Sequence, residues 1–279
     1  MKKIKRFFLW SGFAGILLLF LLLWGSSSMG ERDHFSSLAT VFEQKSLSIG
    51  EYRYPTEGGE IYAVQVGDKT LPTLLLIHGS PGDWTDWKEL IISTNLTDRY
   101  QLIIPDRPGY QYSTAKGGNL SSQSNALAIL MLEHCHPCVV AGHSFGGALA
   151  LQLAVDYPEK VAAIVCLSGT IAAPFQAPKW YNLWGENKWI QQFLSSGFLA
   201  SNREMISLSK DLFALESKIK ELDLPIYLLQ GGKDILVNPD SPFYLLDQLN
   251  QVYLKYNDTW DHFIIWTAME EVALFLLSF

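Results

Sequence analysis

The feature that most constrains this fold is a regular alternation of apolar runs of strand length with segments of helical pattern. It begins at about Leu47 and continues to the C-terminus. The apolar runs are nearly continuous, as in strands that are buried on both faces of a sheet. Strands that alternate with helices are typical of a largely parallel sheet covered by helices on both faces. The sequence therefore predicts an α/β fold.

Eight strands are expected in this sheet. Two alternating segments, Ile49–Tyr54 and Glu60–Val66, are separated by PTEGG and predict an antiparallel hairpin at a sheet edge. The other expected strands are Thr73–Gly79, Tyr100–Asp106, Cys138–Ser144, Val161–Gly169, Leu224–Gly232 and Gln251–Asn257. Helices are expected from about Trp87, from about Ser122, over Phe145–Tyr157, near Ser241–Leu249 and over His262–Leu277.

The segment from about 170 to 223 is longer than a usual connection, so we expect it to form a small helical cap with helices of its own. Its aromatic content suggests an apolar wall over a site. Aromatic residues at helical spacing also pack small helical cores, and the sequence leaves both interpretations open. The candidates for substrate contact in this cap are Trp180, Trp184, Trp189 and Phe193.

Composition excludes some classes of protein. Of 279 residues, 48% are apolar and 18% are charged, so the chain can bury a large core and is not disordered. The net charge is −7, and no basic cluster follows the N-terminus. Non-specific nucleic-acid binding needs such positive charge, so DNA and RNA are not expected partners.

The N-terminus has the pattern of a membrane anchor. Residues 1–6, MKKIKR, carry four cations, and the uncharged run Phe7–Trp24 is about as long as a helix that crosses a bilayer. The positive-inside rule places residues 1–6 in the cytoplasm and the remainder outside, in the periplasm or extracellular space. Residues 25–44 are expected to form a linker and residues 45–279 the folded domain. The alternative is a signal peptide, cut near GSSSMG to release a secreted protein.

A candidate nucleophile lies between an expected strand and an expected helix, in the sequence Gly142-His143-Ser144-Phe145-Gly146. Such a GxSxG turn exposes a serine hydroxyl at the carboxyl end of a sheet. Gly142 and Gly146 would permit the sharp turn, and Ser144 would be the nucleophile.

Three further groups complete a hydrolytic site. His262 is the only histidine after Ser144 and is therefore the candidate base, while Asp234 follows a buried strand through a glycine turn and is the candidate acid. The loop His78–Gly82, HGSPG, follows an earlier strand. The backbone N–H groups of Ser80 and Phe145 would form an oxyanion hole.

These motifs resemble the α/β-hydrolase superfamily. HGSPG, DRPGY (Asp106–Tyr110), GHSFGG, GGKD and WDHF occur in the order of that family. The resemblance implies an eight-stranded sheet, an acyl-enzyme intermediate, and no metal or organic cofactor. It also implies that Asp106 and Arg107 are scaffold residues. The chain is similar to epoxide hydrolases and haloalkane dehalogenases, but those enzymes have an aspartate nucleophile where this chain has Ser144. HGSPG is also similar to the HGGPG loop of proline iminopeptidases.

The sequence thus predicts a serine hydrolase that cleaves a carboxylic ester, with a small-molecule or lipid-like substrate. Hydrolysis of an amide or a carbon–carbon bond by the same triad is the alternative among enzymes. A membrane-tethered binding protein without catalysis is an alternative of another class, since fold alone does not fix function.

The chain has three cysteines, so it can form at most one internal disulfide. Cys166 lies in an apolar run and is expected to be a buried thiol. Cys135 and Cys138 have CxxC spacing, which leaves open a local disulfide or a redox activity; no thioredoxin-like pattern surrounds them.

Overall fold

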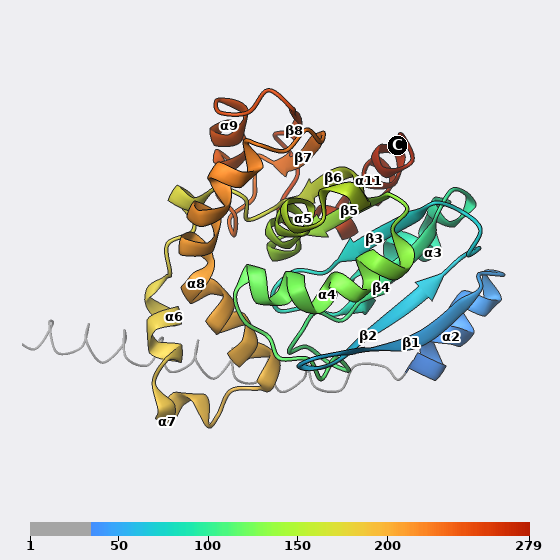
Figure 1. Ribbon diagram of the computed structural model, residues 1–279, viewed down its shortest axis with the longest axis horizontal. Helices are drawn as coiled ribbons and strands as arrows, with labels where there is room; N and C mark the ends of the chain where they lie inside the picture. The colour runs from blue at the N-terminus through green and yellow to red at the C-terminus, as the bar shows by residue number, and fades with distance from the viewer. Residues whose placement is uncertain (1–34) are drawn as a thin grey trace, which may run out of the picture.

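The computed structural model describes residues 35–279, whose centre is an eight-stranded sheet (Figure 1). The strands lie in the order β1-β2-β4-β3-β5-β6-β7-β8. The pairs β1–β2 and β2–β4 are antiparallel and the other pairs are parallel, so the predicted α/β class and the edge hairpin are confirmed. The strands are β1 Ile49–Thr56, β2 Gly59–Val66, β3 Thr73–Ile77, β4 Gln101–Pro105, β5 Cys138–His143, β6 Val161–Leu167, β7 Ile226–Gly231 and β8 Val252–Asn257.

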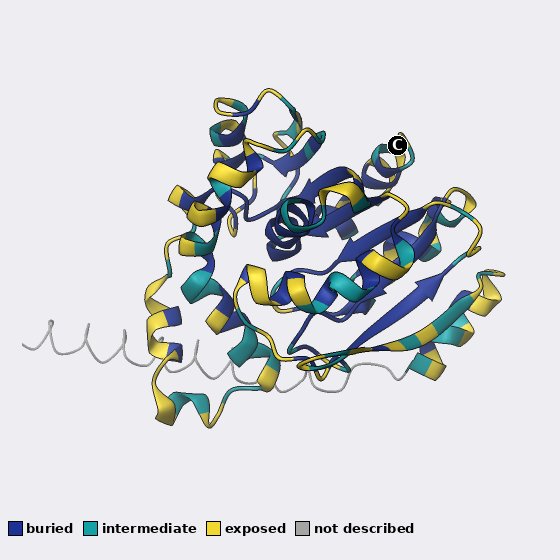
Figure 2. Ribbon diagram, in the orientation of Figure 1, coloured by how far each residue is buried: buried dark blue, intermediate teal, exposed yellow. Residues whose placement is uncertain are grey.

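Helices cover both faces of the sheet, which explains the nearly continuous apolar strands (Figure 2). Along β3, Leu75 and Ile77 join the core on one face, while Leu74 and Leu76 join the core on the other. On the first face lie α4 Leu120–His134, α5 Phe145–Asp156, α8 Ser196–Ile219 and α9 Ser241–Leu246; on the second lie α2 Phe35–Gln44, α3 Lys88–Ser93, α10 Ile264–Thr267 and α11 Met269–Leu276.

Two helix boundaries differ from the sequence prediction. The helix expected from about Trp87 is a 3₁₀ turn, Trp84–Trp87, followed by α3. The final helix, expected over His262–Leu277, begins only at Ile264 and is interrupted at Ala268, which has φ −134°. His262 therefore lies in the loop that precedes this helix. The remaining 3₁₀ turns are Leu96–Asp98, Pro158–Lys160 and Ala173–Phe175.

The segment from 170 to 223 forms helices of its own, as predicted: α6 Trp180–Gly185, α7 Lys188–Gln191 and the long α8. The second half of α8 is not part of a separate cap, however. Leu208, Leu212 and Leu215 follow helical spacing and are buried in the main core against α4 and α5. The helix therefore belongs to the cap at its beginning and to the core at its end.

The folded domain extends further toward the N-terminus than predicted. Residues 35–44, expected to belong to a linker, form α2, and its Leu38 and Phe42 are buried in the core beside Trp84. The two apolar side chains are four residues apart, so one helical face supplies both. The predicted basic segment 1–6, the anchor Phe7–Trp24 and the first part of the linker lie outside the described residues. Within 35–279, no helix is both long and apolar enough to span a membrane.

Replacing Phe42 by alanine tests whether α2 is an integral part of the domain. Its ring is fully buried and its centroid lies 6.4 Å from that of Trp84. We expect Phe42→Ala to lower the free energy of unfolding by about 3–5 kcal/mol, measured by urea denaturation. Glu43→Ala, on the exposed face of the same helix, is the control and should change stability little. Equal stability of both variants would show that α2 contributes nothing to the fold.

Candidate active site

Ser144 occupies a sharp turn between β5 and α5. Its backbone has φ 54° and ψ −119°, a positive φ that residues other than glycine rarely adopt. A Cβ at Gly142 would overlap the carbonyl group of Gly146, and a Cβ at Gly146 would overlap the carbonyl oxygen of Ile77. Glycine at both positions therefore allows α5 to approach β5 and β3 this closely. Ser144 is partly exposed, and its hydroxyl has no hydrogen-bond partner within residues 35–279.

Asp234 and His262 form a buried pair at the same edge of the sheet. Asp234 lies in the turn after β7, and His262 lies in the loop after β8. The Oδ2 atom of Asp234 is 2.9 Å from Nδ1 of His262. Gln230 also donates to Oδ2, and the backbone N–H groups of Leu236 and Val237 donate to Oδ1 at 2.9 and 2.8 Å. The carboxylate is therefore held in one orientation by four donors.

The protonation state of this pair follows from these contacts. Burial raises the pKa of Asp234. The hydrogen bond and positive charge of His262, with the backbone donors, outweigh burial and hold that pKa below its ordinary value. An ionised Asp234 accepts a hydrogen bond from Nδ1–H of His262, so in the neutral imidazole the lone pair is at Nε2. Nε2 has no hydrogen-bond partner among the described residues, so it is available to accept a proton.

His143 positions the loop that carries His262, a role that the sequence did not indicate. Nε2 of His143 lies 2.9 Å from the carbonyl oxygen of His262, and a carbonyl can only accept, so Nε2 carries the hydrogen. Burial, followed by the positive charge of His262, lowers the pKa of His143 to about 3. The ring also packs edge-on against Trp266, with centroids 5.4 Å apart. A neutral histidine next to Ser144 thus connects the nucleophile turn to the base.

No hydrogen bond within residues 35–279 joins Ser144 directly to His262. The two are neighbours through His143, because the rings of His143 and His262 have centroids 5.0 Å apart. Catalytic hydrogen bonds are often long in enzymes without substrate and shorten when substrate binds. The structure therefore brings the three predicted triad residues to one edge of the sheet.

The HGSPG loop lies against the nucleophile turn. A Cβ at Gly79 would be 3.2 Å from Cβ of Ser144. The carbonyl oxygen of Gly79 accepts hydrogen bonds from Nδ1 of His78 and from a guanidinium nitrogen of Arg107, each at 2.8 Å. These donors fix the orientation of the Gly79–Ser80 peptide, which is trans. In a trans peptide the N–H points opposite to the carbonyl.

Neither of the two predicted oxyanion donors has a hydrogen-bond acceptor within the described residues. The N–H of Ser80 points away from His78 and Arg107, and it has no acceptor among the described residues. The N–H of Phe145, the first residue of α5, also lacks an acceptor there, as expected for the first turn of a helix. His78 braces the loop and is not placed as a base, because its Nε2 accepts the backbone N–H of Arg107 at 2.9 Å.

A buried ion pair joins the cap to this loop. Arg107 and Glu204, the latter on α8, are both buried, with an N–O distance of 2.6 Å. The same carboxylate accepts hydrogen bonds from Ser80 Oγ at 2.5 Å, Tyr110 at 2.6 Å and Gln123 at 2.9 Å. One acidic side chain thus ties α8 to two loops and to α4. Sequence analysis missed Glu204 because a single acidic residue in a polar helix carries no pattern.

Asp106 has a scaffold role, as the family resemblance implied. Its carboxylate accepts the backbone N–H groups of Trp84 and Tyr112 at 3.0 and 3.1 Å. Burial raises the pKa of Asp106 to about 8. The negative charge of nearby Asp83 adds to this rise, and the two backbone hydrogen bonds oppose it. Arg107 also stacks over the ring of Phe145, at 4.6 Å from its centroid, so it contacts the neighbourhood of both predicted oxyanion donors.

The four aromatic candidates of the cap do not surround the triad. Trp180, Trp184, Trp189 and Phe193 have mostly exposed side chains, and no hydrogen bond or ring contact joins them to Ser144, Asp234 or His262. A spacing of aromatic residues predicts a helical face but not the direction in which it points. These side chains point to solvent.

A cavity of about 580 Å³ lies beside the HGSPG loop, between residues 109–118 and the start of α8. Pro81, Gly82 and Tyr110 line one side, and Arg203 lines the other. None of the triad residues lines it, so it is separate from the chemistry described above. No group of three or more His, Cys, Asp or Glu within 35–279 could hold a metal ion.

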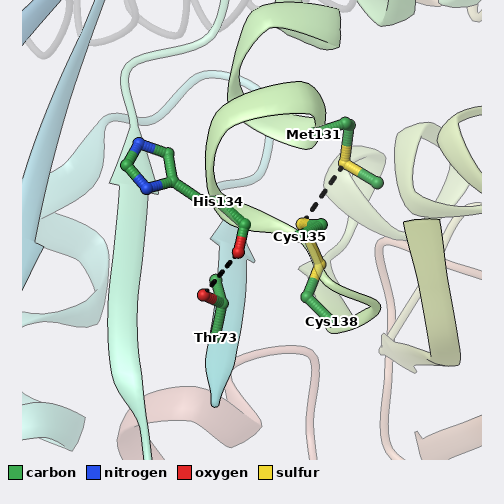
Figure 3. The surroundings of a disulfide bond; sticks show 5 residues. All are labelled: Thr73, Met131, His134, Cys135 and Cys138. Atoms are coloured by element: carbon green, nitrogen blue, oxygen red, sulfur yellow. Dashed lines mark hydrogen bonds between the residues drawn. A yellow bond between two sulfur atoms is a disulfide. The ribbon is translucent and has the colours of Figure 1, made fainter. Parts of the chain in front are cut away.

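Cys135 and Cys138 form a disulfide where α4 meets β5 (Figure 3). Both side chains are buried, and Cys135 packs against Met131. The pair lies at the start of β5, whereas Ser144 follows its end. Buried sulfur atoms are poorly placed to exchange with another thiol. Cys166 is a buried free thiol whose pKa is raised by burial, as expected.

The family model described as alpha/beta hydrolase fold matches residues 72–201. The chain is 33% identical over 138 residues to the magnesium-chelatase 30 kDa subunit of Rhodobacter capsulatus, covering 42% of this chain and 48% of that protein. It is 30% identical over 122 residues to the 2-hydroxymuconate semialdehyde hydrolase of Pseudomonas sp. strain CF600, covering 41% of this chain and 42% of that protein. The chain therefore spans about half the length, or less, of these curated relatives.

Among solved structures, a membrane phospholipase A matches with a TM-score of 0.65 and 18% identity, over 98% of this chain and 97% of that one. A likeness at this identity shows the fold alone. Together with the family model and the sheet order, it shows that the chain has the α/β-hydrolase fold.

The neutral state of His143 predicts a specific dependence of stability on pH. The unfolded chain binds a proton at this histidine near its ordinary pKa of 6.5, whereas the folded chain does so only near 3. The unfolded state therefore binds more protons between these values, and folding loses stability as pH falls through this window. We expect His143→Gln, which keeps an N–H donor, to lose less stability on acidification. Urea denaturation at several pH values measures this, and parallel losses in both proteins would contradict it.

The Arg107–Glu204 pair predicts a large effect of removing one charge. Glu204→Leu leaves the buried charge of Arg107 without an opposite charge beside it, so we expect the free energy of unfolding to fall by about 3–5 kcal/mol. The double variant Arg107→Met, Glu204→Leu removes both charges and should recover part of this loss. Urea denaturation measures the stability of both variants. A single variant as stable as the wild type would show that the ion pair does not stabilise the fold.

Proposed function

We propose that this protein is a serine hydrolase that cleaves a carboxylic ester through an acyl-enzyme. One observation carries the proposal: an oriented, buried Asp234–His262 pair lies at the same edge of the sheet as Ser144 and two N–H groups that have no acceptor within residues 35–279. These are the parts that acyl transfer through serine requires.

In the proposed mechanism, Nε2 of His262 accepts the hydroxyl proton of Ser144 as Oγ attacks the acyl carbonyl. The N–H groups of Ser80 and Phe145 stabilise the oxyanion that forms, while Asp234 stabilises the imidazolium. His262 then gives the proton to the leaving alcohol as the tetrahedral intermediate collapses. Water, deprotonated by the same histidine, then attacks the acyl-enzyme. Collapse of this second tetrahedral intermediate releases the acid, and His262 returns the proton to Oγ of Ser144.

An amide or carbon–carbon bond is the second candidate for the bond that is cleaved. The similarity to a 2-hydroxymuconate semialdehyde hydrolase supports this alternative. Both candidates use the same serine, so they differ in substrate and not in the residues. A binding protein without catalysis is disfavoured, because the proposed nucleophile, base, acid and oxyanion donors are all present.

We further propose that residues 7–24 anchor the chain in a membrane, with the hydrolase domain in the periplasm or outside the cell. The apolar run and the cations before it support this orientation. The Cys135–Cys138 disulfide also supports it, because disulfides persist in oxidising compartments outside the cytosol. Secretion after cleavage of the segment is the alternative. Membrane attachment favours a lipid-like ester as substrate, and the phospholipase among the structural neighbours is consistent with this choice.

Labelling by a fluorophosphonate probe and hydrolysis of a p-nitrophenyl ester series test the activity. With the full chain in detergent, we expect labelling and turnover in the wild type and neither in Ser144→Ala. Asp234→Asn should reduce kcat by about 10⁴-fold, because the imidazole loses its orienting carboxylate. Asp258→Asn, an exposed acid near His262, is the matched control and should retain activity.

The outcomes separate the candidates. Labelling at Ser144 without turnover of any ester would favour the amide or carbon–carbon alternative. Turnover that survives Ser144→Ala would refute the proposed nucleophile. Absence of both labelling and turnover would favour the binding protein.

A further inference from the structure

Helix α6 directs its apolar side chains outward and its polar and small residues inward. Trp180 and Trp184 are each 60% exposed and Leu183 is 61% exposed. Asn182 and Gly185 are the buried residues of this helix. A helix that covers a core has the opposite arrangement, with an apolar inner face. The aromatic residues of α6 therefore do not serve the packing of the cap.

Polar contacts attach α6 to α8 without these aromatic residues. Nδ2 of Asn182 donates to Oδ1 of Asn202 at 3.2 Å, and Nδ2 of Asn202 donates to the carbonyl of Asn182 at 3.1 Å. A Cβ at Gly185 would lie 2.7 Å from side-chain atoms of Asn202, so the helices touch there. Because α6 is held by this face, its aromatic face is left for another partner.

The exposed apolar residues continue along the chain from α6 through α7 to Phe193. The rings of Trp180 and Trp184 have centroids 5.6 Å apart, and Trp189 of α7 is 77% exposed. Figure 2 shows exposed residues along both helices. We call this surface the aromatic face; it comprises Trp180, Tyr181, Leu183, Trp184, Trp189 and Phe193. Soluble proteins rarely expose a large apolar patch unless it binds a protein or a membrane.

The chemistry of the aromatic face fits the boundary of a lipid bilayer. Tryptophan and tyrosine are enriched at membrane–water interfaces, where an apolar ring and a polar N–H or O–H are both satisfied. Lys179 and Lys188 flank the face, and neither forms an ion pair within residues 35–279. Such cations attract anionic lipid headgroups. The nearby acid, Glu186, accepts a hydrogen bond from Asn202 at 2.9 Å.

The length of chain before the described residues favours the same partner. Ten residues, 25–34, separate the apolar run Phe7–Trp24 from Phe35. Fully extended, they span about 35 Å at most. If the run is the anchor proposed above, the domain stays next to the bilayer surface. In Figure 1, α2 lies at the right of the molecule and α7 at its lower left, both in the lower half of the view.

We propose that the aromatic face is a docking surface for a phospholipid bilayer, which seats the cap at headgroup level. The proposal rests on the membrane anchor of the proposed function, but it does not depend on the ester chemistry. It assigns the partner of these residues as lipid and not as substrate in the triad. Docking would place the beginning of α8, which carries Glu204 toward the oxyanion loop, beside the bilayer.

A fluorescent label on the aromatic face tests this proposal. Trp189→Cys in the full chain is labelled with an environment-sensitive dye and reconstituted into vesicles of phosphatidylcholine and phosphatidylglycerol. Labelling is selective because Cys135 and Cys138 form a disulfide and Cys166 is buried. Leu274→Cys on α11, 69% exposed, is the matched control. We expect the dye at 189 to shift to shorter wavelength and to lose most of its emission to nitroxide lipids, with little change at 274.

A second variant checks that the aromatic rings themselves dock. Adding Trp180→Ser and Trp184→Ser to the labelled protein should reduce quenching at 189 while circular dichroism stays unchanged, because both side chains are exposed.

Two results would overturn the proposal. Equal, water-like emission at 189 and 274 would show that the face does not meet the bilayer. A dye at 189 that is shielded from water, unquenched by lipid and more shielded at higher protein-to-lipid ratio would show that a second copy of the chain covers the face. Neither readout requires turnover, so failure of the ester assay leaves this test intact.

Discussion

The close contact of β5, α5 and β3 at Gly142 and Gly146 is the constraint on which the site depends. No Cβ fits at either position, and this absence lets the chain reverse direction within one residue, Ser144. The same turn places the hydroxyl of Ser144 and the N–H of Phe145 on one side of the sheet edge. It also leaves space for Gly79 to approach. One backbone contact therefore sets the positions of the proposed nucleophile and of the two proposed oxyanion donors.

The second constraint is electrostatic. The guanidinium of Arg107 holds the carbonyl of Gly79, and Glu204 holds that guanidinium from the cap. The direction of the Ser80 N–H is thus fixed by groups that contact the carbonyl side of the same peptide. Donors fixed in advance need no reorganisation as charge develops, which is the main source of their catalytic effect in such sites. His143 positions His262 in a similar way. It donates a hydrogen bond to the backbone carbonyl of His262, and its own ring is neutral.

The sequence predicts those parts of the molecule that follow a local pattern. Strands buried on both faces are continuous apolar runs, so the sheet could be predicted. The GxSxG turn, the acid and the base follow a fixed order along the chain, so the grouping of Ser144, Asp234 and His262 could be predicted as well. Helix α2 was missed because its ten residues are too few for a clear apolar periodicity, although two of its side chains are buried. Glu204 was missed because its partner Arg107 lies 97 residues away. The outward direction of the aromatic face was missed because periodicity defines a helix face but not what lies against it.

Helix α8 begins in the cap and ends in the core, and this continuity limits how the protein can change. Leu208, Leu212 and Leu215 keep the helix in the core, and Glu204 keeps its first half against the loops of the site. The cap therefore has no hinge through which it could swing open as a unit. The segment from Phe175 to Ser195 is held to α8 mainly through Asn182 and Gly185. During evolution this segment can be exchanged or lengthened while the ion pair and the core persist, so the surface can change there without disturbing the turn at Ser144 or the Asp234–His262 pair.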